Sequence, residues 1–315
     1  MREGDLVEKI HISGIEAEIR KFFELKMMLL RDFKEGILDD VEKEAIKRNC
    51  DVIRIRNCNE LDSYFYKSTK IGLYRNLQKP LELANLPRNK RGNIKKAEGN
   101  FNFFITENMT DYIFNEWFQI YEERMNEIKR GVKILNRDWF EEKRNKAVGA
   151  FSKKDNQIVG GFIILLMDES NTTIPSLAFG SSKKEFFKLG INDFLVWNII
   201  NWATEKGFKR IKFGTDTNFY GFHLGLGIYH YKIGWGFYPE ARGVMECLKI
   251  LDFSKFEDKI FFLTGNENLQ GNILFRKGSE YKDGKRLFAE NLNVINVYEF
   301  NGGIKLLETI KRNSI

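Results

Sequence analysis

The sequence predicts an α/β fold built around a mixed β-sheet. Between residues 147 and 213 the patterns follow one another as strand, strand, strand, helix and strand, and glycines mark two of the strand ends. Of the 315 residues, 43% are hydrophobic and 14% aromatic, which excludes a disordered chain. Ligands of such sheets bind beyond the carboxyl ends of the strands, so we expect a crevice near Gly180 and Gly214.

The first hundred residues combine helical patterns with one clear strand. Apolar residues recur at steps of three and four and predict a helix over residues 15–33, and a shorter helix is expected over 39–48. Val52 to Arg56 alternates as a strand. Pro87 can open a helix at its first turn, and we expect that helix to run towards Gly99.

The central segment supplies the elements of the sheet. Lys153 to Gln157 has turn chemistry and is expected to join two strands as a hairpin, and Gly207 stands where a helix cap is expected. The expected elements are, in order, a helix at 111–130, strands at 147–151, 158–167 and 172–179, a largely buried helix at 183–206 and a strand at 208–213.

A glycine-rich loop, 214–227, follows these elements, and further short strands are expected after it. The chain from Lys249 onward alternates apolar runs with Gly and Asn, and we interpret it as a β-rich extension. The length is compatible with two domains or with one core and a large appendage. We therefore divide the chain into a helical N-terminal part (1–99), a main domain (100–245) and a C-terminal extension (246–315).

Charge and cysteine content exclude several classes of protein. The 51 Lys and Arg residues outnumber the 44 Asp and Glu residues, giving a net charge of +7, which fits either a solvated basic surface or a polyanionic partner. Three cysteines without a Cys-x-x-Cys pair, and three histidines without metal-ligand spacing, predict neither a disulfide framework nor a metal site.

The sequence also predicts a cytoplasmic protein without a membrane span. The first residues are charged throughout and lack the apolar region of a signal peptide. The longest strongly apolar run, Ile158 to Met167, is about half of the roughly 20 residues that a membrane helix needs.

Two segments carry a family resemblance. The run LAFGSSKKEFFKLGINDFLVWNIINWATEKGFKRIKFGTDT with the later GLGIYHYKIGWGFYPE, and the earlier LPRNKRGNIKKAEGNFNF, resemble the FemAB-like, or BioF2-like, branch of the GNAT-fold acyltransferases. The resemblance covers about residues 85–240, roughly half of the chain. The positions that match the family pattern are Gly190, Leu195, Trp197, Trp202, Ala203, Gly207, Phe213, Gly214, Tyr231, Lys232 and Gly236.

This resemblance implies a GNAT-like mixed sheet flanked by helices, with a shortened N-terminal GNAT-like half. It also implies amide formation, in which an acyl or aminoacyl group moves from an activated carrier to a primary amine. Such a reaction needs the amine and the carbonyl held in attack geometry, a proton acceptor and donors aimed at the oxyanion. The carrier is acyl-CoA in one set of relatives and aminoacyl-tRNA in another, and no metal is required.

The turn at Lys188, Gly190, Ile191 and Asn192 is the predicted donor-binding site. It precedes the buried helix, and a helix N-terminus attracts phosphate. The glycine-rich loop of CoA-binding relatives is reduced here to one glycine, and Lys183 and Lys184 could supply charge instead. Equally, Gly190 could serve only close packing.

Lys232 is the first candidate for a catalytic residue. The family match falls on it, and alternation along a strand would place it opposite Tyr231 and Ile233. A point charge there could stabilise the oxyanion or a carrier phosphate. A surface lysine is the alternative.

The loop after residue 213 supplies the other candidates for catalysis. Asp216 could accept the amine proton or orient the ammonium group, or it could simply initiate a turn. His223 and His230 are the near-neutral bases beside this loop, where structural roles are commoner, and His223 is kept as a catalytic candidate. Tyr220 and Tyr229 are candidates for the acceptor pocket.

The basic segment around Arg88, Arg91 and Lys95 is a candidate phosphate or acceptor contact. Five cations and one acid fall between Arg88 and Gly99, and these three cations recur at helical spacing. A solvated helix face explains such a run as well as contact with a tRNA, a nucleotide-sugar or CoA does.

The sequence thus predicts an N-acyltransferase that acts on a primary amine of an envelope or surface-glycan precursor. Acyl-CoA is the favoured donor, because no inserted coiled-coil arm of the kind seen in some tRNA-using relatives is evident. The alternatives are an aminoacyl-tRNA-dependent transferase acting on a cell-wall peptide and a non-catalytic RNA- or nucleotide-binding module. The sequence leaves the oligomeric state open.

Overall fold

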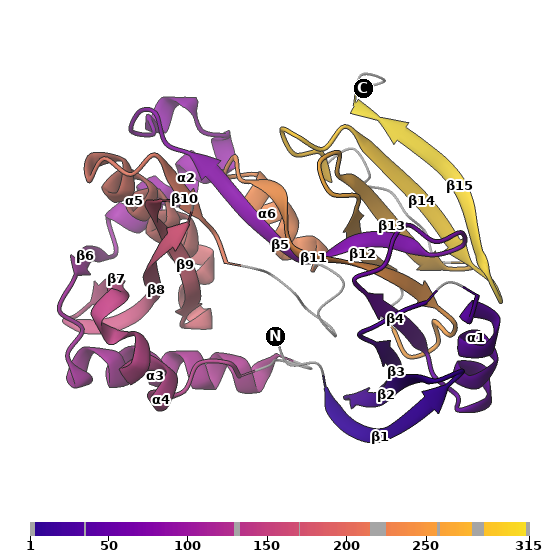
Figure 1. The fold of residues 1–315 in the computed structure, drawn as a ribbon. Helices are drawn as coiled ribbons and strands as arrows, with labels where there is room; N and C mark the ends of the chain where they lie inside the picture. Colours follow the sequence, from indigo (N-terminus) through magenta and orange to yellow (C-terminus); the bar gives the residue numbers. More distant parts are fainter. Residues whose placement is uncertain are drawn as a thin grey trace. The chain divides into compact units, whose positions relative to one another are not determined.

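The computed structural model describes residues 4–34, 36–128, 133–169, 171–214, 225–256, 259–278 and 287–312 (Figure 1). The chain forms two compact units. The first contains Met1–Leu73 and Thr215–Ile315, and the second contains Tyr74–Gly214. Strand β5 (Phe65–Asn76) contributes residues 65–73 to the first unit and 74–76 to the second. The three domains expected from the sequence stay a prediction.

The first unit holds two sheets. In one, the strand order is β1-β2-β3-β4-β11-β5, and in the other it is β12-β13-β14-β15. The other elements of this unit are β1 (Asp5–Ile12), β2 (Ile15–Phe22), β3 (Leu25–Leu30), α1 (Leu38–Lys47), β4 (Val52–Arg56), α6 (Leu226–Ile233), β11 (Tyr238–Ile250), β12 (Lys259–Thr264), β13 (Gln270–Arg276), β14 (Val294–Phe300) and β15 (Ile304–Lys311). The β-rich C-terminal extension predicted from the sequence is confirmed.

The helix predicted over residues 15–33 is wrong. These residues form the antiparallel hairpin β2–β3, with Ala17 opposite Leu30 and a positive φ of 53° at Phe23 in the turn. Along β3, Met28 packs into the core that contains α1, whereas Met27 packs into the core beneath β12 and β13. A strand buried on both faces has a continuous apolar sequence, which periodicity alone does not distinguish from a helix.

A buried ion cluster connects the middle strands of this sheet. Glu246 accepts hydrogen bonds from Arg54 Nη2 at 2.7 Å and from Lys67 Nζ at 2.8 Å, and all three side chains are buried. Burial by itself would raise the pKa of Glu246, but Lys67 and Arg54 outweigh it and lower this pKa to about 2. Glu246 therefore stays charged, while burial lowers the pKa of Lys67, and the hydrogen bonds of Glu246 connect β4, β5 and β11.

The second unit is a mixed sheet with helices. From residues 74–76 of β5 the order continues β10-β9-β8-β7-β6, and β10 runs parallel to β9. Its elements are η1 (Leu83–Asn85), α2 (Arg88–Glu98), β6 (Asn102–Thr106), α3 (Asp111–Glu127), α4 (Arg137–Lys143), η2 (Arg144–Lys146), β7 (Ala147–Lys154), β8 (Gln157–Glu169), β9 (Thr172–Ser182), η3 (Lys184–Leu189), α5 (Ile191–Glu205) and β10 (Arg210–Lys212). The predicted α/β class with a mixed sheet is confirmed.

Local chemistry accounts for most of these elements. Strands β7 and β8 meet in a two-residue turn at Asp155 and Asn156, both with positive φ, as the predicted hairpin requires. The fully buried Trp117 of α3 packs against Phe151 and donates from its indole Nε1 to the Gly161 carbonyl at 3.2 Å. Aromatic packing of α3 on β7 and β8 forms the core of this unit.

Among the predicted boundaries of this unit that differ from the structure, two lie close to the turn at Gly190. Strand β9 continues to Ser182, three residues beyond its predicted end, because residues 180–182 still pair with β8. The single helix predicted for 183–206 is interrupted at Gly190, which has a φ of 81° and separates η3 from α5. Gly207, with a φ of 79°, stands just after α5 as predicted.

Candidate functional site

Helix α2 separates its residues into a buried face and a basic face. Lys90, Ile94 and Ala97 are buried, whereas Arg88 and Lys95 are exposed. Because these two sets follow the helical repeat, one face can pack while the other presents cations. The cationic face predicted from the sequence is thus present.

Polar contacts connect helix α2 to the first turn of α5 and to the segment before it. Asn93 Nδ2 donates to Asp193 Oδ2 at 2.7 Å, and Lys90 Nζ lies 3.6 Å from Asp193 Oδ1. Lys96 Nζ donates to the Lys188 carbonyl at 2.8 Å. The basic segment and the predicted donor-binding turn are therefore neighbours in the second unit.

Gly190 has a packing reason to be glycine. Its φ of 81° lies in the left-handed region, and a Cβ built there would lie 2.4 Å from the Asn93 carbonyl oxygen. The close packing is thus against the backbone of α2. A role of Gly190 in binding a donor stays a prediction.

The other members of the predicted donor turn have different surroundings. Ile191 is buried, and the side chain of Lys188 is exposed. Asn192 accepts a hydrogen bond from Ser182 Oγ at 2.9 Å, which ties the start of α5 to the end of β9. Lys188 is therefore the member of this turn whose side chain can reach a ligand in solvent.

Burial perturbs the ammonium group of Lys90. It lowers the pKa of Lys90 to about 8, against the opposing effect of the Asp193 carboxylate. Lys90, Asn93 and Asp193 were not predicted as site residues from the sequence. The sequence does contain a signal for the burial of Lys90. This lysine has the spacing that places it on one helix face with the apolar Ile94 and Ala97.

We define the α2–η3 basic surface as seven cations on or beside these two elements: Arg88, Arg91, Lys95, Lys96, Lys183, Lys184 and Lys188. The guanidinium group of Arg91 already makes one hydrogen bond, from Nη1 to the Ala84 carbonyl at 3.1 Å. None of the seven lies within ion-pair distance of a carboxylate in the part of the chain that the structure describes.

Several cations elsewhere in the second unit are paired with carboxylates, whereas Lys153 and Lys154 lie over aromatic rings. Arg137 and Arg144 both bind Asp111, Lys146 binds Asp168 at 3.0 Å, and Lys206 binds Glu107 at 3.1 Å. Unpaired cations on two packed elements produce a positive potential that attracts phosphate groups.

A small cavity opens beside the start of η3, with a volume of about 200 Å³. Its lining includes Ser182, Lys183 and Lys184 together with Arg124, which is paired with Glu127 at 2.7 Å. Glu123 and Glu185 also line it, so the cavity has mixed charge. The positive potential belongs to the surrounding surface rather than to this cavity.

Strands β9 and β10 form the parallel pair at which the sequence predicts a crevice. Their ladder is limited to Lys212 opposite Ser176, while β9 continues through Ser182 with an exposed Gly180. Within the described residues, the last four residues of β9, 179–182, pair with β8 alone. Beyond Ala178, no strand among the described residues pairs with this side of β9, and β9 leads directly into η3 and the turn before α5.

The strand predicted for Lys232 is wrong, because this residue lies on helix α6 of the first unit. Alternation over Tyr231, Lys232 and Ile233 is too short to distinguish a strand from a helix, and the buried Tyr229 and Lys232 have helical spacing. Lys232 is only 5% exposed. The alternative of a solvent-exposed lysine does not hold.

The predicted residues near α6 differ in their accessibility. Tyr229 is fully buried with its ring 4.8 Å from that of Phe261, and burial raises the pKa of its hydroxyl. His230 is exposed. Asp216, Tyr220 and His223 lie outside the described residues, so the roles predicted for them, as for Lys232, stay predictions.

No family model matches the sequence, and no curated protein matches it. Solved structures that align with the chain include L-PGS from Bacillus licheniformis, with 16% identity over 78% of this chain and 85% of that chain and a TM-score of 0.43. FemX aligns with 13% identity over 78% of this chain and 87% of that chain, with a TM-score of 0.42.

An aminoglycoside acetyltransferase, meta-AAC0020 from an uncultured soil metagenomic sample, aligns with 17% identity over 38% of this chain and 80% of that chain, with a TM-score of 0.32. FemAB-like and GNAT-type proteins, the group that the sequence motifs resemble, are thus among the structural neighbours.

Two further properties concern the described residues alone. None of their helices combines the length and apolar character needed to cross a bilayer. No group of three or more His, Cys, Asp or Glu side chains in the described ranges is arranged to hold a metal ion.

Proposed function

We propose that this chain is an amide-forming transferase, which moves an acyl or aminoacyl group from a phosphate-bearing carrier to a primary amine of an envelope or surface-glycan precursor. The observation that supports it most is the end of β9, residues 179–182, which among the described residues pairs on one side only and leads into the α2–η3 basic surface. An extended amide chain can pair with such an edge, while the cations hold phosphates at its end.

The chemistry follows from the proposed donor. The amine nitrogen attacks the carbonyl carbon, a C–N bond forms, the bond from carbon to the carrier's sulfur or oxygen breaks, and the amine proton passes to a base. Lys232 is the proposed stabiliser of the oxyanion, and Asp216 or His223 the proposed proton acceptor. These three assignments rest on the family resemblance.

Acyl-CoA remains the first candidate donor, because one pyrophosphate and one extended thiol arm match the turn and the end of β9. One observation favours aminoacyl-tRNA as the second candidate. The basic surface continues along α2 to Arg88 and Lys95 without neutralising acids at ion-pair distance among the described residues, as a nucleic-acid backbone requires.

The test is incubation of the full chain with labelled acetyl-CoA and, in parallel, labelled aminoacyl-tRNA, against a pool of amino sugars and wall peptides. Label on an amine from acetyl-CoA supports the first candidate, and label only from tRNA makes tRNA the donor. Salt-sensitive RNA binding without transfer from either donor would replace the proposal by a non-catalytic nucleic-acid-binding module.

The α2–η3 basic surface gives a sharper prediction. Lys95→Ala with Lys188→Ala removes two cations without a described acidic partner, and we expect the KM for the donor to rise roughly tenfold while kcat changes less than twofold. The matched control is Lys146→Ala with Lys206→Ala, which removes two paired lysines of the same unit. Equal effects of the two double variants on KM would contradict a specific donor surface.

A further inference from the structure

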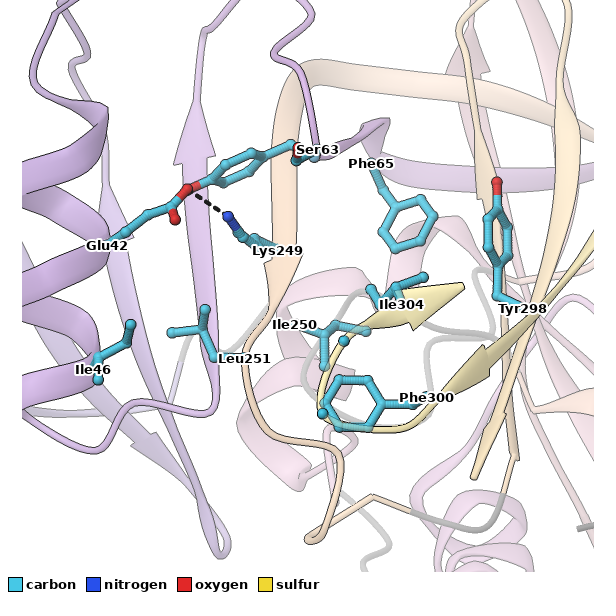
Figure 2. Close-up of a pocket in the computed structure, with 13 residues that line it drawn as sticks. Glu42, Ile46, Ser63, Phe65, Lys249, Ile250, Leu251, Tyr298, Phe300 and Ile304 are labelled. Carbon is cyan, nitrogen blue, oxygen red and sulfur yellow. Dashed lines mark hydrogen bonds and ion pairs between the residues drawn. The ribbon is translucent and has the colours of Figure 1, made fainter. Parts of the chain in front are cut away.

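A second cavity lies wholly within the first unit and uses none of the residues assigned to transfer. Its volume is about 610 Å³. It is lined by α1, the residues at the start of β5, the end of β11 and the β14–β15 hairpin (Figure 2). Small-molecule sites have volumes of roughly 300–1,000 Å³ and combine apolar walls with a few polar groups.

One side of the cavity is apolar and preorganised. Figure 2 shows Phe65, Ile250, Phe300 and Ile304 grouped on this side. The ring of Phe65 stands edge-on to Phe262 at 4.7 Å and to Tyr298 at 5.4 Å. Because these side chains also pack on the core between the two sheets, they cannot readily collapse into the empty volume.

The other side carries one acid and one base. Glu42 Oε1 accepts from Lys249 Nζ at 2.6 Å (Figure 2). It also accepts from the Tyr64 hydroxyl at 3.1 Å. Lys249 Nζ also lies 5.2 Å from the centre of the Tyr64 ring. Within the described ranges, Glu42 Oε2 has no hydrogen-bond partner, so the pair still offers an acceptor.

The charges of Glu42 and Lys249 cancel, and this restricts the ligand. A charged head group would enter a partly dehydrated cavity without a counter-charge of its own, because each partner is already neutralised by the other. An uncharged head group that donates and accepts hydrogen bonds meets no such cost. It could donate to Glu42 Oε2 and accept from Lys249.

We infer that this cavity binds a small uncharged amphiphile, with an aromatic or branched apolar body against Phe65, Tyr298 and Phe300 and a hydroxyl or amide head at Glu42 and Lys249. This inference is independent of the proposed transferase activity.

The test uses four probes that share one aromatic body: 2-naphthylethanol, 2-naphthylethylamine, 2-naphthylacetate and 2-ethylnaphthalene. Calorimetry with the full chain is expected to show the alcohol binding at least fivefold tighter than each of the other three. Shifts of the Ile250 and Ile304 methyl resonances on binding of the alcohol would place the probe in the cavity. An amine or carboxylate that binds as tightly as the alcohol would overturn the inference, and so would equal binding of 2-ethylnaphthalene.

Two substitutions each remove one charge of the Glu42–Lys249 pair and nearly preserve the shape of the side chain. Glu42→Gln leaves Lys249 unneutralised and is expected to make the naphthylacetate the preferred probe, whereas Lys249→Met is expected to prefer the amine. Lys47→Met, on an exposed lysine of the same helix that does not line the cavity, should leave the order of probes unchanged. An unchanged order in all three folded variants would contradict a role of the Glu42–Lys249 pair.

Discussion

Lys90 lies on the buried face of α2, where its ammonium group faces Asp193 at 3.6 Å. Removing an ammonium group from water disfavours its charged form, and the carboxylate offsets only part of this cost. The contact between Lys90 and Asp193 nevertheless links α2 to α5. A cation used in this way is separate from the cations of the α2–η3 basic surface, although Arg91 follows it directly in sequence.

The lowered pKa of Lys90 predicts how stability depends on pH. Between its folded pKa of about 8 and its ordinary value of 10.5, the unfolded chain binds this proton and the folded chain does not. The free energy of unfolding should therefore rise with pH in this window, by up to roughly 3 kcal/mol from this group. We expect this rise in urea unfolding of the natural protein relative to the double variant Lys90→Met with Asp193→Asn. Parallel curves for the two proteins between pH 8 and pH 10 would show that Lys90 is not perturbed.

At the scale of elements, the break between η3 and α5 determines how α2 packs. Gly190 combines a positive φ with contact against the backbone of α2, so the turn and the helix packing depend on the same residue. Gly207 at the other end of α5 has almost the same φ, 79°, but a Cβ there would meet nothing within 4 Å. A comparison of substitutions at Gly190 and Gly207 therefore separates the cost of backbone strain from the cost of steric overlap.

Alanine at these two positions should have unequal effects. Gly207→Ala carries only the strain of the left-handed conformation, roughly 1 kcal/mol. Gly190→Ala adds a clash with a carbonyl oxygen, so we expect a loss of about 3 kcal/mol or more in the free energy of unfolding. Chemical denaturation measures both losses. Similar losses of unfolding free energy in the two variants would contradict a steric clash between residue 190 and the backbone of α2.

At the scale of the whole molecule, one of the two units is discontinuous in sequence. The second unit is one continuous segment with its own aromatic core around Trp117. The first unit is assembled from two distant segments, because β11, which is formed by residues after 237, lies between β4 and β5. A chain of residues 1–73 alone would lack β11, the strand that connects β4 to β5.

This arrangement predicts how fragments behave. A fragment comprising Tyr74–Gly214 should unfold cooperatively in urea, whereas a fragment of residues 1–73 should show no transition. Circular dichroism monitors both. A cooperative transition in residues 1–73, or none in Tyr74–Gly214, would contradict the assignment of the two compact units.

Local patterns in the sequence were sufficient for much of the second unit. The Asp155–Asn156 turn, the aromatic stripe of α3 and the glycine after α5 each depend on neighbours within a few residues, and each is present as predicted. The candidate site could be predicted from local patterns only in part. The cationic face of α2 could be predicted from its spacing, and its proximity to the turn at Gly190 is a property of the fold.

The sequence by itself determined the α/β class, the position of the basic segment and the β-rich C-terminal part, because these depend on composition and on short periodicities. Only the tertiary structure decided that residues 15–30 form a hairpin, that Lys232 lies on a buried helix and that Lys90 pairs with Asp193. Each of these depends on which distant surface covers a residue. A continuous apolar run or an isolated lysine has the same sequence in either environment, and burial against a particular partner selects between them.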